Sequence, residues 1–251
     1  DFICKEYTGE FTRVVYPYHL FSRNAQELEI DFRLITEGRE SAPLNSSVQV
    51  YGKYPVFVEE GAVVRCAVIN TEGGPVYIGK DAEIMEGVLV RGPLAMCEHS
   101  VLTMGAKVYG ATTLGPYCKC GGEVNNVVMI GYSNKAHDGF LGNSVLGEWC
   151  NIGAGTNNSN LKNTYVEVKL WDYETKHFCR TGLQFCGLIM GDHAKLGIST
   201  MINTGTVIGV GTNIFGSDFP RNFVPSFSWG GASGFTEHKM NQFVSTAEAV
   251  M

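Results

Sequence analysis

The sequence repeats with a period of six residues, and this repeat leaves very few possible folds. A period of six fits neither an α-helix nor an amphipathic strand by itself. It is typical of a short strand followed by a turn, with three such units closing one triangular coil and stacked coils pairing as parallel strands. Counted in sixes, eight successive units begin with Ile78, Ile84, Val90, Met96, Leu102, Val108, Leu114 and Cys120. The fifth position of each unit is mostly small or β-branched: Ala82, Val88, Leu94, Ser100, Ala106, Thr112, Cys118 and Val124.

The same pattern returns in shorter runs and is broken in between. An earlier run begins at Val58, and later runs begin at Leu146 and Met190. Residues 126–141 lose the phase, and residues 157–187 are expected to loop out of the stack. Segments expelled from a regular scaffold often carry function, so these breaks are where we look for a site.

The ends of the chain differ from its middle, and three regions are expected. Residues 1–50 contain no repeat and read as a tail or linker with a short helix over Ala25–Leu34. Residues 51–217 form the β-helix. Residues 218–251 read as an irregular segment followed by a helix over Thr236–Met251, with Thr236 as its N-cap. The two helices are expected to cap the ends of an otherwise all-β stack.

Composition excludes several classes of function. A net charge of −6 disfavours nucleic acid as a partner. No apolar stretch is long enough to span a membrane and no signal peptide is visible, which predicts no membrane and a cytoplasmic location. The eight cysteines are expected to be reduced and structural, and the absence of any Cys-x-x-Cys pair argues against zinc. Because the chain begins at Asp1 rather than Met, a fragment or processed product is expected.

One stretch carries a more specific pattern. It contains Lys135-Ala136-His137, Leu141-Gly142, Asn151-Ile152-Gly153-Ala154-Gly155-Thr156 and Asn160. These elements resemble, in order and spacing, the acetyltransferase domain of the bifunctional N-acetylglucosamine-1-phosphate uridyltransferase/glucosamine-1-phosphate acetyltransferases. The resemblance covers roughly residues 55–217 and extends to a subgroup described as sugar nucleotidyltransferases, which have a nucleotidyltransferase domain before the β-helix.

The resemblance implies a left-handed parallel β-helix that assembles as a homotrimer. It implies acetyl-CoA or a related acyl-CoA as co-substrate and a sugar or sugar phosphate as the other substrate. Residues 1–50 then look like the tail of a preceding nucleotidyltransferase-like domain, whose glycine-rich nucleotide loop is not in this chain. Mg²⁺ is implied only if such a domain is present.

The resemblance assigns the general base to His137. Histidine is the side chain best suited to take a proton near neutral pH, as acyl transfer to an amine requires. Other histidines, such as His99 and His193, lie at regular repeat positions and read as structural. No histidine triad suggests a metal site.

Acceptor and co-substrate residues are carried over position by position. Asn160 matches a residue that contacts the sugar, while the family's following Tyr is Leu161 here. Asn125 and Asn126 replace two phosphate-binding lysines. The candidate acceptor residues are therefore Asn160, Asn126, Lys162, Lys169 and, as a compensating cation, Arg91. The late repeats match the region along the pantetheine arm, which gives Gly197, Ser199, Gly216 and Arg221 as acyl-CoA residues.

Two functions remain open from the sequence. The first is an acyl-CoA-dependent acyltransferase acting on an amino sugar or sugar phosphate, with His137 as base. The second is a trimerisation or regulatory module of a sugar-1-phosphate nucleotidyltransferase, without acyl transfer of its own. The intact spacing around His137 favours the first, and Leu161, Asn125 and Asn126 favour the second.

Overall fold

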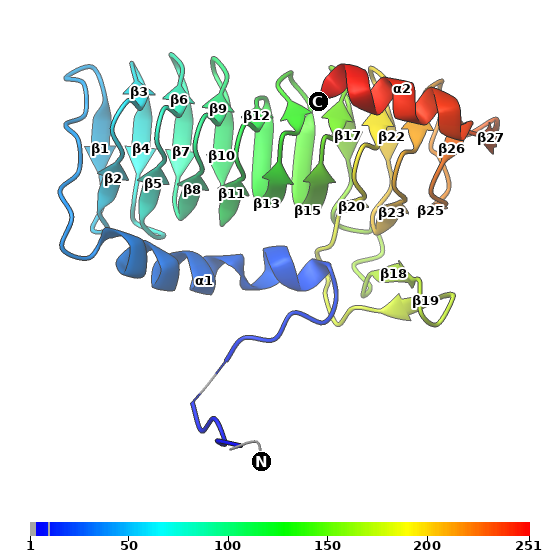
Figure 1. Cartoon of the computed structure of the whole chain (residues 1–251), viewed down its shortest axis with the longest axis horizontal. Helices are drawn as coiled ribbons and strands as arrows, with labels where there is room; N and C mark the ends of the chain where they lie inside the picture. Colours follow the sequence, from blue (N-terminus) through cyan, green and yellow to red (C-terminus); the bar gives the residue numbers. More distant parts are fainter. Residues whose placement is uncertain (1–3, 10) are drawn as a thin grey trace.

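The chain forms a parallel β-helix with three faces (Figure 1), as the six-residue repeat predicts. The computed structural model describes residues 4–9 and 11–251, so Asp1 lies outside the described residues. The first face carries β1 (Gln49–Tyr51), β4 (Val68–Asn70), β7 (Leu89–Arg91) and β10 (Lys107–Tyr109), continued by β17 (Asn157–Asn158) and β22 (Met201–Ile202).

The second face runs the whole length of the stack. It carries β2 (Val56–Val58), β5 (Val76–Ile78), β8 (Leu94–Met96), β11 (Thr112–Leu114), β13 (Glu123–Gly131), β15 (Phe140–Glu148), β20 (Leu188–Met190), β23 (Thr206–Ile208) and β25 (Phe223–Val224). β13 pairs with β10 through its first residues and with β11 through its later ones, so it bends from the first face onto the second.

The third face is a ten-stranded sheet. It carries β3 (Val63–Val64), β6 (Glu83–Ile84), β9 (Val101–Leu102), β12 (Lys119–Cys120), β14 (Asn134–Lys135), β16 (Asn151–Ile152), β21 (Lys195–Leu196), β24 (Asn213–Ile214) and β26 (Ser228–Gly231), closed by β27 (Gly234–Glu237). Only β27 pairs antiparallel in this sheet.

The core confirms the inward positions read from the repeat. Every first-position residue from Ile78 to Cys120 is at most 3% exposed, and every fifth-position residue from Ala82 to Val124 is at most 1% exposed. The two breaks in phase also have structural counterparts. β13 and β15 belong to coils 17 residues long, because Glu123 pairs with Phe140. Residues 159–187 leave the stack and contain the hairpin of β18 (Lys169–Asp172) and β19 (His177–Arg180).

The helix near the N-terminus lies along a side of the prism, whereas a cap across its end was expected. α1 (Tyr18–Thr36) begins seven residues before the predicted Ala25, directly after Pro17, whose ring favours a helical start. It runs alongside the stack (Figure 1) and contacts β11, β13 and β15. Its Phe21 is buried in one cluster with Val128 and Val145. Outward-facing valines on the second face explain this position, because they need an apolar cover.

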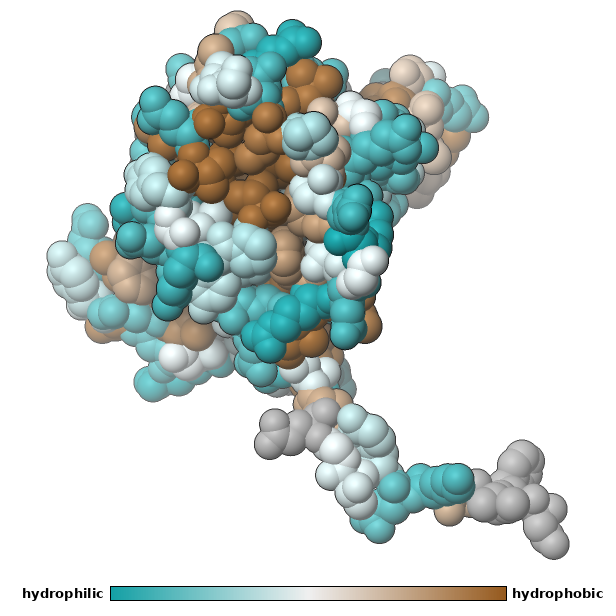
Figure 2. All heavy atoms as spheres, turned by 90° about the vertical axis from the view of Figure 1, so that its left-hand side faces the viewer, coloured by the Kyte–Doolittle hydropathy of each residue, from teal (hydrophilic) through white to brown (hydrophobic). Residues whose placement is uncertain are grey.

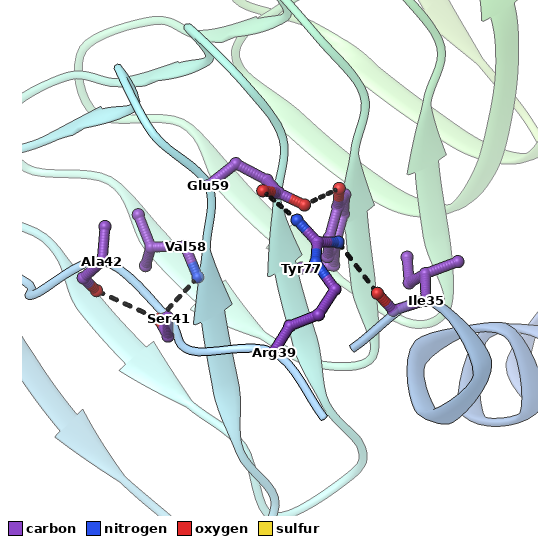
Figure 3. A network of polar contacts seen from close by, with 7 residues as sticks. All are labelled: Ile35, Arg39, Ser41, Ala42, Val58, Glu59 and Tyr77. Atoms are coloured by element: carbon purple, nitrogen blue, oxygen red, sulfur yellow. Dashed lines mark hydrogen bonds and ion pairs between the residues drawn. The ribbon is translucent and has the colours of Figure 1, made fainter. Parts of the chain in front are cut away.

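The first coil is covered instead by the segment that follows α1. Ala42, Leu44 and Val48 pack partly over the end of the core, and Figure 2 shows the apolar patch that remains visible there. The segment is pinned by Arg39, which donates to Glu59 at 2.6 Å and to the carbonyl of Ile35 at 2.9 Å (Figure 3). Tyr77 donates to the same carboxylate, and burial together with Glu59 raises the pKa of Tyr77 to about 12.

The C-terminal prediction was wrong at its start. α2 spans Met240–Val250 with Lys239 at its N-cap, so Thr236 does not cap it. Thr236 lies in β27, which folds back on β26 after a glycine-containing turn and pairs with the last parallel strand. The segment expected to be irregular also contains β25 and β26, so parallel pairing continues beyond residue 217.

Aromatic rings stack along the corner between the second and third faces. His99, Tyr117, Tyr132, Trp149 and His193 occupy equivalent corner positions with φ between +50° and +59°. Successive centroids lie 4.6, 5.4, 4.5 and 6.2 Å apart in near-parallel planes. Because each inner ring has a neighbour on both sides, the stack presents ring edges rather than faces to solvent. This placement agrees with a structural role for His99 and His193.

Acidification is expected to loosen α2. The ring of Phe243 in α2 meets His193 edge-on at 5.6 Å. Burial, and then the charge of Lys195, lower the pKa of His193 below its ordinary 6.5. The unfolded chain therefore binds the proton more readily, and the free energy of unfolding falls as the pH drops through 6.5. Hydrogen exchange of residues 240–250 at pH 7.5 and 5.5, corrected for intrinsic rates, should show faster opening at the lower pH. The variant His193→Gln should lose that difference, and equal opening of the wild type at both pH values would contradict the account.

Candidate functional site

His137 lies on an exposed corner of the prism, between the third and first faces. It lies two residues after the end of β14 at Lys135, and its side chain is exposed. Within residues 4–9 and 11–251 the imidazole has no hydrogen bond and no ion pair. The ring is therefore free to approach a substrate and exchange a proton with it.

Small residues flank His137 along this corner, which we call the histidine corner. Gly121 and Gly122 occupy it one coil earlier, and Gly153 to Gly155 one coil later. The coils approach too closely for side chains here: a Cβ at Gly153 would lie 2.6 Å from the carbonyl carbon of Gly197. The result is an open strip around the imidazole. It is bordered farther along by the exposed side chains of Met104 and Ile198.

Three of the four predicted acyl-CoA residues lie on the same corner as His137. Asp138 accepts a hydrogen bond from Gly155 at 2.9 Å, and Ala154 accepts one from the backbone of Ser199 at 2.7 Å. Ser199 is thus two coils from His137, about 10 Å along the stack. Gly197 precedes it, Gly216 occupies the corner of the next coil, and both Ser199 and Gly216 are exposed. Arg221 is exposed in the segment before β25.

Asn126 and Asn160 lie on a different corner, between the first and second faces. Asn160 donates to Asn143 at 2.7 Å. In the amide orientation that satisfies its neighbours, Asn126 accepts from Asn143 at 3.0 Å and donates to Phe21 of α1 at 2.9 Å. Asn126 and Asn143 have φ of +56° and +48°, a conformation that asparagine tolerates better than most residues. We call these three residues the asparagine ladder.

The asparagine ladder is expected to contribute strongly to stability. Asn143→Ala removes a side chain that bonds to both neighbours and leaves an alanine at positive φ, so we expect a loss of about 2–3 kcal/mol in the free energy of unfolding. Lys176→Ala is the matched control, because Lys176 has φ +55° in an exposed turn. Denaturant unfolding of both variants checks this. Equal losses would mean that backbone strain alone accounts for the effect.

The predicted acceptor cations are scattered. Lys162 lines a polar cleft of about 390 Å³ with Ser159, Asn203 and Asn222, next to the asparagine ladder. Lys169 is exposed on β18. Arg91 lies on the first face in a shallow depression of about 420 Å³ together with Lys107. The structure thus places three of the four acyl-CoA candidates on the corner of His137, but neither Arg221 nor the acceptor candidates of the same chain.

A row of polar residues on the third face, near the histidine corner, received no role from the sequence, although Asn151 belongs to the quoted motif. Asn134 and Asn151 face outward on the third face, and Asn134 donates to Asn151 at 2.8 Å. Lys195 is the next residue in this row, and it donates to the carbonyl of Trp149 at 3.2 Å. Each of these residues immediately precedes an inward residue of its strand, so the repeat register held the signal. Amides at this place suit hydroxyl groups, since they both donate and accept.

In residues 4–9 and 11–251 the site contains neither a metal-binding cluster nor a disulfide. Among the described residues, no three His, Cys, Asp or Glu side chains converge in a way that would hold a metal ion. All eight cysteines are free, and four of them are buried. Burial raises the pKa of Cys120 and Cys150 to about 12, so these thiols remain protonated at neutral pH. No helix in the described part of the chain is long and apolar enough to cross a membrane.

Comparison with curated proteins gives relatives of one kind. No protein-family model matches the chain. A bifunctional sugar-1-phosphate nucleotidylyltransferase/acetyltransferase of Sulfurisphaera tokodaii is 30% identical over 144 residues, which are 57% of this chain and 35% of that protein. The bifunctional protein GlmU of Methanocaldococcus jannaschii is 29% identical over 155 residues, 61% of this chain and 35% of its own length. GlmU of Synechococcus elongatus is 25% identical over 164 residues, which are 62% of this chain and 32% of that protein.

The homologues are GlmU-type nucleotidyltransferase/acetyltransferases. They confirm the resemblance drawn from the residues around His137. The matched part spans about a third of the length of these relatives. Among solved structures, the polySia specific acetyltransferase NeuO aligns over 82% of this chain with 11% identity and a TM-score of 0.32, a likeness too low to bear on function.

Proposed function

We propose that this chain is an acyl-CoA-dependent acyltransferase that transfers an acetyl or related acyl group to the amine of an amino sugar or its phosphate. The observation that carries the proposal is the exposed His137, which has no partner among the described residues, on a corner lined by small residues. Gly197, Ser199 and Gly216 lie on the same corner. The GlmU-type relatives supply the class of reaction.

The chemistry requires one base and one hydrogen-bond donor. The acceptor nitrogen attacks the thioester carbonyl carbon while the His137 imidazole takes its proton. The C–S bond then breaks and CoA leaves as the thiolate. The proton taken from the amine stays on the His137 imidazolium, which can pass it to the thiolate. The backbone N–H of Ala154, one coil from His137, donates no hydrogen bond among the described residues. It is therefore available to stabilise the oxygen of the tetrahedral intermediate.

A homotrimer would complete the acceptor site. The asparagine ladder and Lys162 lie on a different corner from His137, so one chain does not surround an acceptor at His137 by itself. Three prisms packed side by side would bring one protomer's histidine corner next to another surface of its partner. Residues such as Arg91, Lys162 and Lys169 would then act on an acceptor held by the neighbouring protomer.

One observation favours the alternative of a non-catalytic trimerisation module. The amide groups of Asn126 and Asn160 are bonded within the asparagine ladder, which leaves them fewer polar atoms for a sugar. Thiol release from acetyl-CoA, measured with a panel of amino sugars and sugar 1-phosphates, separates the two functions. Release that depends on one acceptor supports the acyltransferase. No release with any acceptor, from a trimer that fails to bind CoA, would leave the β-helix as a scaffold.

A further inference from the structure

A lysine lies inside the β-helix next to His137. Lys135 points inward from β14 and is 1% exposed. The residues that occupy the same inward position in the other coils are apolar: Ile84, Leu102, Cys120, Ile152, Leu196 and Ile214. Burying an ammonium group is costly unless its protons are hydrogen-bonded, so a lysine at this position needs hydrogen-bond acceptors inside the prism.

The ammonium group of Lys135 is bonded to the backbone of the histidine corner. Nζ donates to the carbonyl of His137 at 2.6 Å and to that of Gly121, one coil earlier, at 2.9 Å. Burial lowers the pKa of Lys135, while Cys120 and Asp138 oppose the shift. The side chain thus ties two successive coils together from within, and one of the two tied carbonyls belongs to the proposed base.

Thr103 holds the carbonyl of Ala136, the residue before His137, from outside the core. Its Oγ1 donates to the carbonyl of Ala136 at 2.9 Å, although Thr103 lies two coils away. The intervening coil has Gly121 at this place, and a side chain there would overlap both Thr103 Oγ1 and the carbonyl of Ala136. The glycine therefore leaves the gap through which the hydroxyl reaches.

Three consecutive carbonyls of the histidine corner are thereby fixed by groups from three different coils. Ala136 accepts from Thr103, His137 from Lys135, and Asp138 from the amide of Gly155. With the backbone fixed on both sides, only the side-chain torsions of His137 remain free. Holding a base to within a fraction of an ångström matters because a misplacement of about 1 Å can cost about 100-fold in rate.

We infer that Lys135 and Thr103 are positioning residues that fix the backbone of the histidine corner so that His137 meets its substrate in one orientation. The inference rests on the proposed function of His137. Neither side chain is exposed at the corner as His137 is, so neither is a catalytic residue.

Lys135→Met tests this, because methionine keeps much of the side-chain length and removes the ammonium. We expect kcat with acetyl-CoA and glucosamine 1-phosphate to fall about 10–100-fold while KM for acetyl-CoA stays within about twofold. The melting temperature should not fall, since an apolar side chain replaces a buried cation. Hydrogen exchange of residues 136–140 and of the Gly155 amide should become faster. Thr103→Val should show the same changes more weakly.

Ser133→Ala is the matched control. Ser133 is buried in the same coil but bonds at another corner, to the carbonyl of Gly147 and the amide of Cys150. We expect this control to lower the melting temperature and to leave kcat and exchange at the histidine corner unchanged. A fall in kcat without a fall in the melting temperature of Lys135→Met distinguishes positioning from general destabilisation.

Two results would overturn the inference. The first is a Lys135→Met protein with wild-type kcat and wild-type exchange at residues 136–140. The second is a fall in kcat that Ser133→Ala reproduces. If the wild-type chain transfers no acyl group, the proposed function fails separately, and the exchange of residues 136–140 and Gly155 decides alone whether Lys135 fixes this corner.

Discussion

Replacing His137 with glutamine is expected to lower kcat for acyl transfer by about 100- to 10,000-fold. Glutamine keeps a polar side chain of similar reach but cannot take up a proton near neutral pH. Because the imidazole has no described hydrogen bond, its loss should leave the melting temperature unchanged. The affinity for CoA, measured by calorimetry, should also stay close to that of the wild type.

His99→Gln is the control for this variant. His99 is also a corner histidine, but it is only partly exposed and lies in the aromatic stack against Tyr117. It should retain wild-type kcat, with at most a small loss of stability. Equal activity of the two variants would remove His137 from the proposed mechanism.

Gly115→Ala is expected to have the largest effect on stability. A Cβ at Gly115 would overlap the carbonyl oxygen of Ile130 in the next coil. Neither atom moves easily, because Gly115 itself donates a backbone hydrogen bond to Met129 at 2.8 Å. We expect a loss of about 4 kcal/mol or more in the free energy of unfolding, or failure to fold.

Gly105→Ala provides the comparison. Gly105 has φ +70° and nothing within 4 Å of an added Cβ. Only the cost of placing an alanine in the left-handed backbone conformation remains, about 1–2 kcal/mol. Denaturant unfolding of the two variants therefore separates close coil packing from backbone strain. Equal losses would contradict the coil spacing described here.

The sequence predicted the inner surface of the prism because side-chain burial there follows the repeat directly. Ile78, Leu102 and Cys120 point inward, as expected from a period of six. The same logic predicted a loop over residues 157–187, since a long run without the repeat has no place in a regular coil. The structure has the loop over residues 159–187, because Asn157 and Asn158 still form β17.

Features that depend on contacts between distant coils were not predicted. The position of α1 depends on Val128 and Val145 facing outward, which a six-residue count does not reveal when the coils become 17 residues long. The start of α2 was misplaced because pairing with β26 outweighs the capping preference of Thr236. The asparagine ladder likewise joins positions that are 17 residues apart.

For the candidate site, sequence reasoning located the histidine corner and missed what holds it. The resemblance assigned Gly197, Ser199 and Gly216 to the acyl-CoA, and the coil register places them on the same corner as His137. Lys135 was noted only as part of a motif. Its inward direction is set by the phase of β14, which lies in a region where the repeat is broken.

The most direct test of the account is a product measurement. The wild-type chain and His137→Gln are incubated with ¹³C-labelled acetyl-CoA and glucosamine 1-phosphate or a related amino sugar, and the sugar is analysed by mass spectrometry. We expect a labelled N-acetyl product from the wild type and at least about 100-fold less from the variant. Equal product from both proteins, or no product from a wild-type chain that also fails to bind CoA, would contradict it.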